Sequence, residues 1–256
     1  MVCKFVFNLM IAALLFLSCK DIPRDNLLDP GNPNSYRQSV VLLEAFVNTA
    51  NPYPYNQMAL AALDSIKNQY QDQVVIVEYH RSAPDYQDSL DSPVFENLYQ
   101  KYVGAFSPSQ KGVPDIFING TGSRVQGASS TQNVFHRLNP LLSDLVVERN
   151  YFTLEPGEIK WDGSKLNATC LIARLGDQPA EDLLLKMVPL RQINSASLKR
   201  VALDLKKSVS IAQLEAGEIS TQKFGDIALD EKPDALVFYL SSDDELTVYQ
   251  AIRVDL

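Results

Sequence analysis

Few side chains in this sequence could act as a nucleophile or as a redox centre. The chain of 256 residues contains 3 cysteines and 2 histidines. The cysteines are Cys3, Cys19 and Cys170, so no Cys-x-x-Cys pair is present. Disulfide exchange needs one thiolate to attack and a second thiol to resolve the mixed disulfide. The sequence therefore excludes dithiol oxidoreductase activity for the monomer, and we expect no enzyme of that class.

Cys170 is the thiol that could still do chemistry by itself. It lies in an alternating segment, residues 165–173, and shares its parity with Leu166, Ala168 and Ile172. This pattern predicts the inward face of a strand, and burial in apolar surroundings raises the pKa of a thiol. We therefore expect a structural role. The alternative is a thiol-dependent oxidoreductase or peroxidase that acts through Cys170 or through the thiols of a partner.

The histidines and the acidic residues form no metal-ligand pattern. His80 and His136 are far apart in the sequence, and no fixed ligand spacing joins them. Asp85, Asp88 and Asp91 are spaced by three, but the glycine and the terminal glutamate of a calcium-binding EF-hand loop are missing. We expect these carboxylates on a solvated surface and both histidines in structural roles. The sequence predicts no metal and no cofactor.

The amino terminus has the pattern of an export signal. Lys4 supplies a positive charge, and the 13 residues from Phe5 to Leu17 are apolar except for Asn8. This stretch is too short to cross a hydrocarbon core of about 30 Å as a helix, but it suits a signal peptide.

The signal ends in Phe16-Leu17-Ser18-Cys19, which resembles a bacterial lipobox. The resemblance implies that residues 1–19 are a lipoprotein signal peptide. It also implies that acylated Cys19 anchors the protein in a bacterial cell envelope, at the outer membrane, facing the periplasm or the surface. An ordinary signal peptide with an incidental cysteine is the alternative. Residues 20–37 are rich in proline and have no hydrophobic period, so we expect an extended tether.

Residues 38–149 follow the element order of a thioredoxin-like α/β domain. Apolar runs at 40–47 and 74–79 flank a helical period at 60–70, which predicts a βαβ unit with a right-handed crossover. Further on, the pattern predicts a helix at 92–105, strands at 114–119 and 123–127, and a helix at 130–148.

A specific resemblance accompanies this order. Residues 44–55 read EAFVNTANPYPY, and they resemble, without a gap, the Glu-x-Phe-Thr-x-x-Trp-Cys-x-Tyr-Cys-Pro segment of bacterial thioredoxin-like outer-membrane lipoproteins. Gly112-Val113-Pro114 resembles the Gly-Val-Pro of that family, which implies a cis peptide bond before Pro114. The resemblance covers about residues 38–149. The chain beyond residue 150 is similar to the β-rich extension of the same lipoproteins.

This chain departs from the family pattern at the residues that carry the family's thiol chemistry. The two cysteine positions align with Asn51 and Pro54, and neither side chain can form a thiolate or a sulfur bridge. The resemblance therefore implies a domain without redox activity. Tyr53 and Tyr55 stand in the turn where the family has its redox pair, at a groove that receives extended peptide from partner proteins. These tyrosines could form a protein-binding patch, or they could fill the space left by the lost residues.

Residues 150–256 have no helical period. Alternating or apolar runs recur between turn clusters, at 165–173, 182–190, 200–206, 209–214, 235–240 and 246–254. Six such strands predict an antiparallel, immunoglobulin-like β-sandwich, which would be a separate all-β domain.

The charge balance limits the partners. The chain carries 23 basic and 31 acidic residues, a formal net charge of −8. An acidic chain repels polyphosphate, so we expect no nucleic-acid partner. The sequence thus predicts a lipid-anchored envelope protein without catalysis, whose partners are a membrane and an extended peptide or an envelope protein. A surface carrier for a small ligand or ion is a further hypothesis.

Overall fold

The structure is a computed structural model that describes residues 25–192, 200–203 and 207–256. The predicted signal peptide, the predicted anchor Cys19 and residues 20–24 of the predicted tether lie outside the described residues. Of the described residues, 44% lie in strands and 21% in helices.

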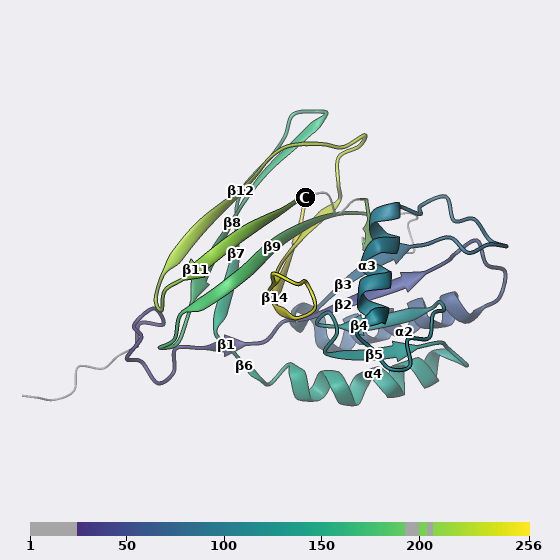
Figure 1. The fold of residues 1–256 in the computed structure, drawn as a ribbon, viewed down its shortest axis with the longest axis horizontal. Coiled ribbons are helices and arrows are strands. Elements are labelled where there is room, and N and C mark those ends of the chain that lie inside the picture. The colour runs from purple at the N-terminus through teal and green to yellow at the C-terminus, as the bar shows by residue number, and fades with distance from the viewer. Residues whose placement is uncertain (1–24, 193–199, 204–206) are drawn as a thin grey trace, which may run out of the picture.

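The first half of the described chain contains all of its α-helices (Figure 1). These helices are α2 (Tyr55–Tyr70), α3 (Pro93–Gly104) and α4 (Thr131–Leu145), and a 3₁₀ turn, η1 (Gln71–Gln73), follows α2. The strands of this half are β1 (Arg37–Gln38), β2 (Val41–Val47), β3 (Val74–His80), β4 (Asp115–Ile118), β5 (Ser123–Gln126) and β6 (Arg149–Asn150). The second half contains β7 (Phe152–Trp161), β8 (Lys165–Arg174), β9 (Ala180–Arg191), β10 (Val201–Ala202), β11 (Lys207–Leu214), β12 (Ile219–Ala228), β13 (Ala235–Ser242) and β14 (Val248–Asp255).

The predicted fold class, an α/β thioredoxin-like domain followed by an all-β immunoglobulin-like sandwich, is wrong. Strands from both sides of residue 150 share one nine-stranded sheet in the order β14-β13-β9-β10-β3-β2-β4-β5, with β11 paired to β9. A second sheet has the order β12-β8-β7, and β1 pairs with β6. The described chain is therefore mostly β, and a separate thioredoxin-like domain is not evident in it.

Strands β9 and β13 explain the error. In a sandwich, alternate residues of a strand face away from the core. Residues 185–190 of β9 and 235–241 of β13 are instead buried without interruption, which is typical of central strands covered on both faces. Periodicity within one strand does not identify the strands beside it, so the sequence did not reveal that the large sheet continues across residue 150.

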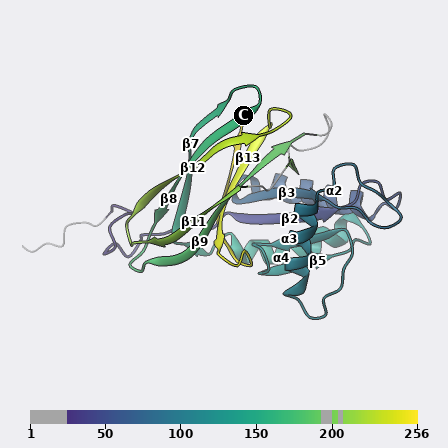
Figure 2. The same ribbon diagram turned by 45° about the horizontal axis from the view of Figure 1, so that its top comes forward.

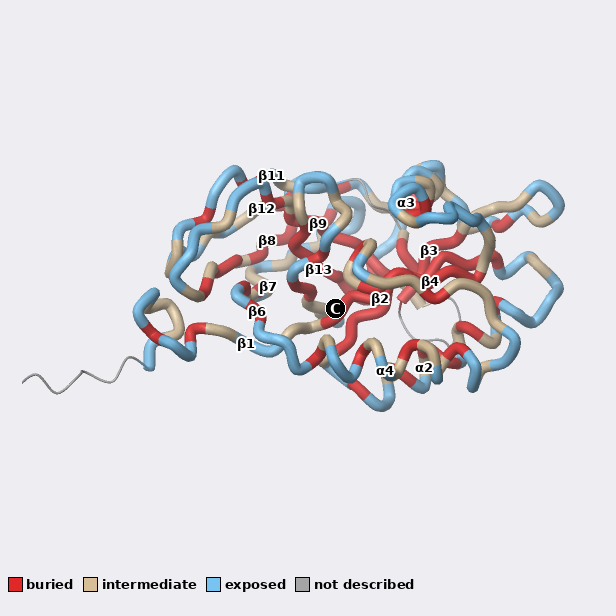
Figure 3. Tube along the Cα trace, turned by 60° about the horizontal axis from the view of Figure 1, so that its bottom comes forward, coloured by how far each residue is buried: buried red, intermediate tan, exposed pale blue. Residues whose placement is uncertain are grey.

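Three clusters of buried side chains lie against this sheet; the helices beside the sheet are seen in Figure 2, and its buried strands are red in Figure 3. On one face, α2 and α4 contribute Leu63 and Leu138 to a cluster with β2, β3 and β4. On the other face, Tyr99 of α3 shares a cluster with Val188 of β9, so one core contains residues from both halves of the chain. A third cluster, which includes Cys170, lies between the second sheet and strands β9, β11 and β13.

Local chemistry sets the helix starts. The Ser92 hydroxyl accepts a hydrogen bond from Val94 N at 3.4 Å, with Pro93 in the first turn of α3. The Ser130 hydroxyl accepts from Asn133 N at 3.0 Å and begins α4. Serine at the N-cap accepts a backbone N–H bond that the helix itself cannot satisfy.

The described part of the predicted tether is not extended. Residues 26–36 form successive turns, in which Asp29 N donates to Asn26 O at 3.1 Å and Asn32 N to Asp29 O at 2.9 Å. The buried Ser35 hydroxyl accepts from Gly176 N at 2.8 Å. The segment turns because its Asn, Asp and Ser side chains bond nearby backbone groups. The bond between Ser35 and Gly176 holds it against the turn that follows β8.

Candidate functional site

Two tyrosines that the sequence singles out lie where β2 leads into α2: Tyr53 is in the connecting loop, and Tyr55 is the first residue of α2. Tyr53 and Tyr55 are 54% and 47% exposed, and their rings stack with centroids 5.9 Å apart. Pro52 and Pro54 beside them are also exposed. Residues with about half of their surface in solvent are not packed in an internal space, which favours the binding-patch interpretation over the space-filling one. We call residues 48–55, which end at the first residue of α2, the tyrosine loop.

Buried amides hold the start of this loop. Asn56 Nδ2 donates to Asn48 O at 2.8 Å, and Asn48 N donates to Asn56 Oδ1 at 3.2 Å. Asn51 N donates to Asn48 Oδ1 at 3.0 Å, and Asn51 Oδ1 accepts from Tyr53 N at 2.9 Å. Asn51 therefore fixes the turn in which Tyr53 lies. Together with the exposed Pro54 it presents no ionisable group.

A second loop, residues 81–92 between β3 and α3, braces the first one. Asp88 Oδ2 accepts from Thr49 N at 2.7 Å and from the Thr49 hydroxyl at 3.0 Å. Asn48 Nδ2 donates to Tyr86 O at 2.8 Å. Parallel pairing of β2 with β3 sets Val47 beside His80, so both loops leave the same edge of the sheet. The two loops thus form one unit with the tyrosine loop at its surface.

A buried charge network lies beneath this unit. His80 is 0% exposed; its Nδ1 lies 3.0 Å from Asp88 Oδ2 and its Nε2 lies 3.0 Å from Glu78 Oε1. Arg200 Nε donates to Glu78 Oε2 at 2.8 Å, and Arg200 also pairs with Asp64 of α2. Each carboxylate of the network therefore faces a cation, as burial of charge requires.

The network keeps His80 charged. Burial alone would lower the pKa of His80, but hydrogen bonds to Asp88 and Glu78 outweigh it and raise that pKa to about 9. Burial alone would raise the pKa of the Asp88 carboxyl. The hydrogen bonds that it accepts from His80 and from backbone N–H groups outweigh this effect and hold that pKa below its usual value. At neutral pH both ring nitrogens of His80 therefore carry protons and donate them. Neither nitrogen has a lone pair left to act as a base or to bind a metal.

Pro114 lies at the adjoining edge of the same sheet. The Val113–Pro114 peptide bond is cis, and Pro114 is buried. Phe46 of β2 pairs with Asp115 of β4, so Pro114 lies beside the end of β2. Asp115 is itself buried and bonded to Arg124, whose Nε donates to Asp115 Oδ1 at 2.9 Å. Pro114 is thus buried at an edge of the sheet that hydrogen bonds hold in place, and it is not exposed to a ligand.

Cys170 is far from reactive. It is 0% exposed on β8, and Leu166, Ala168 and Ile172 are buried on the same face, which confirms the predicted inward position. Burial raises the pKa of the thiol to about 12. The thiolate is therefore a very small fraction of this side chain at neutral pH.

Glu44 of β2 is a second buried titratable group. Its carboxylate accepts from the Tyr102 hydroxyl at 2.8 Å and from the Tyr79 hydroxyl at 3.3 Å. Burial raises its pKa to about 7, although both hydroxyls and Lys186 favour the charged form. Glu44 is 0% exposed, so a substrate could reach it only if the core opened.

The expectation that Asp88 lies on a solvated surface is wrong, because this side chain is 6% exposed and bonded to His80. Its neighbours Asp85 and Asp91 are exposed, as expected. A signal was present in the sequence. Glu78 and His80 lie two residues apart in an apolar strand, so they share a buried face. Buried ionisable groups need partners of opposite charge.

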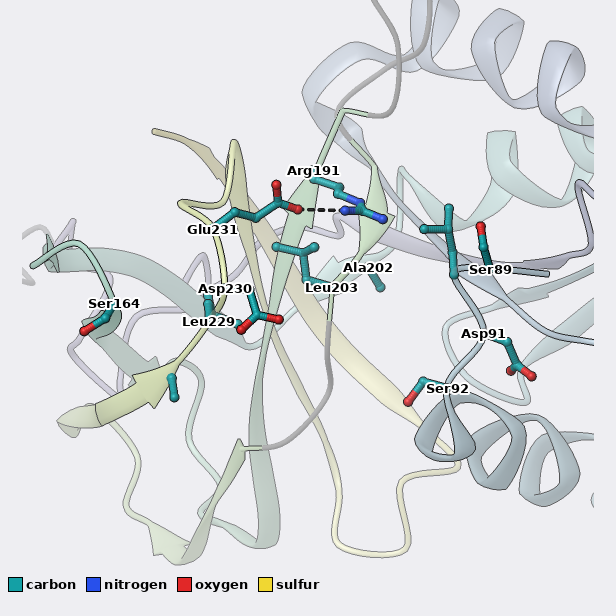
Figure 4. Close-up of a pocket in the computed structure, with 12 residues that line it drawn as sticks. Ser89, Asp91, Ser92, Ser164, Arg191, Ala202, Leu203, Leu229, Asp230 and Glu231 are labelled. Atoms are coloured by element: carbon teal, nitrogen blue, oxygen red, sulfur yellow. Dashed lines mark hydrogen bonds and ion pairs between the residues drawn. The ribbon is translucent and has the colours of Figure 1, made fainter.

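A cleft of about 820 Å³ lies beside the second loop (Figure 4). Ser89, Asp91 and Ser92 line it from that loop, and Asp230 and Glu231 line it from the segment after β12. Arg191 Nη1 donates to Glu231 Oε1 at 2.7 Å. The cleft presents hydroxyls and carboxylates, but the described residues that line it include no thiol and no imidazole.

Within residues 25–192, 200–203 and 207–256, no three side chains of the His, Cys, Asp and Glu types are grouped as metal ligands would be. None of the helices in the same ranges combines the length and the apolar character needed to cross a membrane.

Comparisons with known proteins bear on the fold. No family model matches the chain, and no curated protein matches it. The solved structure of HBP35 of Porphyromonas gingivalis is similar with a TM-score of 0.64 and 14% identity, over 86% of this chain and 76% of that chain. A protein of Agrobacterium tumefaciens is similar with a TM-score of 0.55 and 16% identity, over 85% of this chain and 95% of that one. The chain therefore shares its fold with two bacterial proteins, and at these identities the likeness extends to the fold alone.

Proposed function

We propose that this chain is a lipid-anchored protein of a bacterial cell envelope that binds an extended peptide segment of another envelope protein through the tyrosine loop and performs no thiol chemistry. The observation that carries the proposal is the stacked pair of Tyr53 and Tyr55. Each tyrosine is about half exposed, on a loop whose backbone is held by buried side chains.

The character of the tyrosine loop supports binding. Tyrosine is enriched among the residues that dominate binding energy at protein interfaces, and large rings bury apolar area at little cost in side-chain entropy. The prolines on either side of Tyr53 restrict the backbone. The hydrogen bonds that Thr49 N donates to Asp88 and that Asn51 N donates to Asn48 restrict the backbone further. Less order is therefore lost on association, which favours affinity.

The absence of accessible thiol chemistry supports a binding role over the oxidoreductase or peroxidase hypothesis. Cys170 is the one thiol that a chain without residues 1–19 retains. Its burial and its raised pKa oppose formation of the attacking thiolate. An enzyme that used the thiols of a partner would still need a site that aligns them, and the tyrosine loop offers amides, prolines and phenols there.

The lipid anchor rests on the sequence. The apolar stretch and Phe16-Leu17-Ser18-Cys19 support cleavage before an acylated cysteine. The resemblance of residues 44–55 to a segment of outer-membrane lipoproteins supports the envelope location. Cys19→Ala, or globomycin, should block maturation and prevent recovery of a lipid-modified protein from membranes. Normal processing of Cys19→Ala would contradict the anchor.

The binding proposal is tested in two steps. A photo-crosslinking amino acid at position 53, in intact cells, identifies the partner. The affinity of the purified partner is then measured for wild type and for the double variant Tyr53→Ala, Tyr55→Ala. Truncation of residues that dominate an interface costs about 2 kcal/mol or more, so we expect a loss in affinity of about 30-fold.

The matched control is Tyr249→Ala, which removes a tyrosine that is 37% exposed on β14. Equal affinity of wild type and the double variant would refute the tyrosine loop as the binding surface. For the competing hypothesis, purified protein should not accelerate disulfide reduction. Turnover that Cys170→Ser abolishes would establish the oxidoreductase instead.

A further inference from the structure

We propose that the tyrosine loop is the membrane-distal end of the anchored molecule, and that the peptide it binds comes from a protein segment that is not embedded in the anchoring membrane. This inference rests on the anchor in the proposed function. It deepens that function by naming where the partner must be.

The described chain begins at one end of the molecule's long axis, at the left in Figure 1. Residues 26–36 are bound firmly to this end. Ser35 accepts from Gly176 N at 2.8 Å, and Gly217 approaches Leu28 so closely that its backbone leaves no room for a Cβ. Gly217 N in turn donates to Arg174 O at 2.9 Å. The point at which the chain would leave for the membrane is therefore fixed to the turns that follow β8 and β11. We call these turns, with residues 26–36, the proximal end.

The loops after β2 and β3 lie at the opposite end of the long axis (Figures 1 and 3). From β1 at the proximal side the chain enters β2, whose seven residues span about 23 Å at roughly 3.3 Å per residue. The tyrosine loop and residues 81–92 then follow at the far edge of the sheet. Thr49 and Asp88 join these two loops, so they stay together at that end.

The length of the intervening chain ties the proximal end to the bilayer. Five residues, 20–24, separate Cys19 from Asp25. Six Cα–Cα steps reach at most about 20 Å, at roughly 3.3 to 3.6 Å for each residue. A folded body of this size has a radius of gyration of about 17 Å, and hence a diameter of roughly 45 Å. The proximal end therefore stays closer to the bilayer than the length of the folded body.

Charge opposes a position in which the molecule lies on its side. The chain has a formal net charge of −8, and anionic lipid headgroups repel it. The short connection to Cys19 keeps the proximal end near the bilayer, and this repulsion is smallest when the rest of the acidic body points away from it. The long axis then points away from the bilayer, and Tyr53 and Tyr55 lie beyond the reach of segments embedded in it.

The test is energy transfer from a single label to acceptor lipids in vesicles that carry the mature, acylated protein. Asp85→Cys places the label on the loop bonded to the tyrosine loop, and Gln178→Cys places it at the proximal end. Both positions are exposed, and buried Cys170 does not compete for the label. We expect transfer from position 178 to exceed that from position 85 by about twofold or more, given the reach worked out above.

Flotation of the vesicles separates the possible failures. Equal transfer from both positions in floated protein, or stronger transfer from position 85, would overturn the orientation and leave the anchor intact. Protein that does not float with the vesicles would overturn the anchor and the orientation with it. The peptide-binding role is judged separately, by the affinity of the Tyr53→Ala, Tyr55→Ala variant.

Discussion

Replacing His80 with glutamine should remove a stabilisation that depends on pH. The pKa of His80 is raised from 6.5 to about 9 in the folded protein. A shift of this size corresponds to about 3 kcal/mol, because one pKa unit is worth about 1.4 kcal/mol. The folded state binds the proton more tightly than the unfolded state does. The stabilisation is therefore complete below pH 6.5, and it is lost as the pH rises through 9.

Urea unfolding of wild type and His80→Gln at pH 6 and at pH 9.5 measures this directly. We expect His80→Gln to lose about 3 kcal/mol relative to wild type at pH 6 and clearly less at pH 9.5. A small part of the difference remains at pH 9.5, because the imidazole of wild-type His80 is still partly protonated half a unit above a pKa of about 9.

The control is His136→Gln, since His136 is exposed on α4. It should leave both free energies of unfolding close to those of wild type. If wild type and His80→Gln lose stability in parallel between pH 6 and 9.5, His80 is not the imidazolium that the distances to Asp88 and Glu78 imply.

Three further substitutions or labelling experiments test two buried side chains, Glu44 and Cys170, and one glycine with positive φ, Gly176. The pKa of the Glu44 carboxyl is raised from 4.5 to about 7, so the folded state resists its ionisation, and wild type should lose about 3 kcal/mol of stability between pH 4.5 and 7. Glu44→Gln should not show this loss. The same pH profile in the variant as in wild type would contradict this. Cys170, in a chain without residues 1–19, should react with a thiol reagent at pH 8 only after unfolding in guanidinium, and prompt reaction of the native protein would refute its burial. Gly176→Ala should cost about 1–2 kcal/mol from its positive φ of 79°, plus a clash with Tyr151 Cδ1 at 2.9 Å. Gly163→Ala, with a φ of 97° and open space around it, should show the backbone cost alone.

Much of the local structure could be predicted from the sequence, because it depends on neighbours along the chain. The alternation around Cys170 predicted a strand and its inward face, and both are confirmed. The helical period at 60–70 lies within α2, and the helix predicted at 92–105 matches α3 to within a residue at each end. These patterns are written in periods of 2 or 3.6 residues, which need no knowledge of distant contacts.

The assembly of strands into sheets could not be predicted in the same way. Val201 of β10 pairs with Arg191 on one side and with Glu78 on the other, although more than 100 residues separate Val201 from Glu78. The strands of the two halves were recognised one by one, but the resemblance of residues 38–149 to a known family led to a separate domain there. The pairing of β10 with β3 contradicts that separation.

The candidate site was predicted in part. The tyrosine loop was singled out by the resemblance of residues 44–55 to a segment in which a known family carries its redox pair. Its exposure became known only from the structure, since a tyrosine packs in a core as readily as it lies on a surface. The acidic series was misinterpreted at Asp88, because the partners of this carboxylate, Thr49 and His80, come from two other elements.

The shared core has a practical consequence for anyone who wishes to produce part of this protein. Tyr99 from the first half packs in the same cluster as Val188 and Val237 from the second. A recombinant fragment that stops near residue 150 would leave that apolar surface in water and β3 without its neighbour β10. Unpaired strand edges and bare apolar patches drive association of chains. The apparent junction at residue 150 is therefore a poor truncation point, and fragments made there should precipitate rather than fold as independent modules.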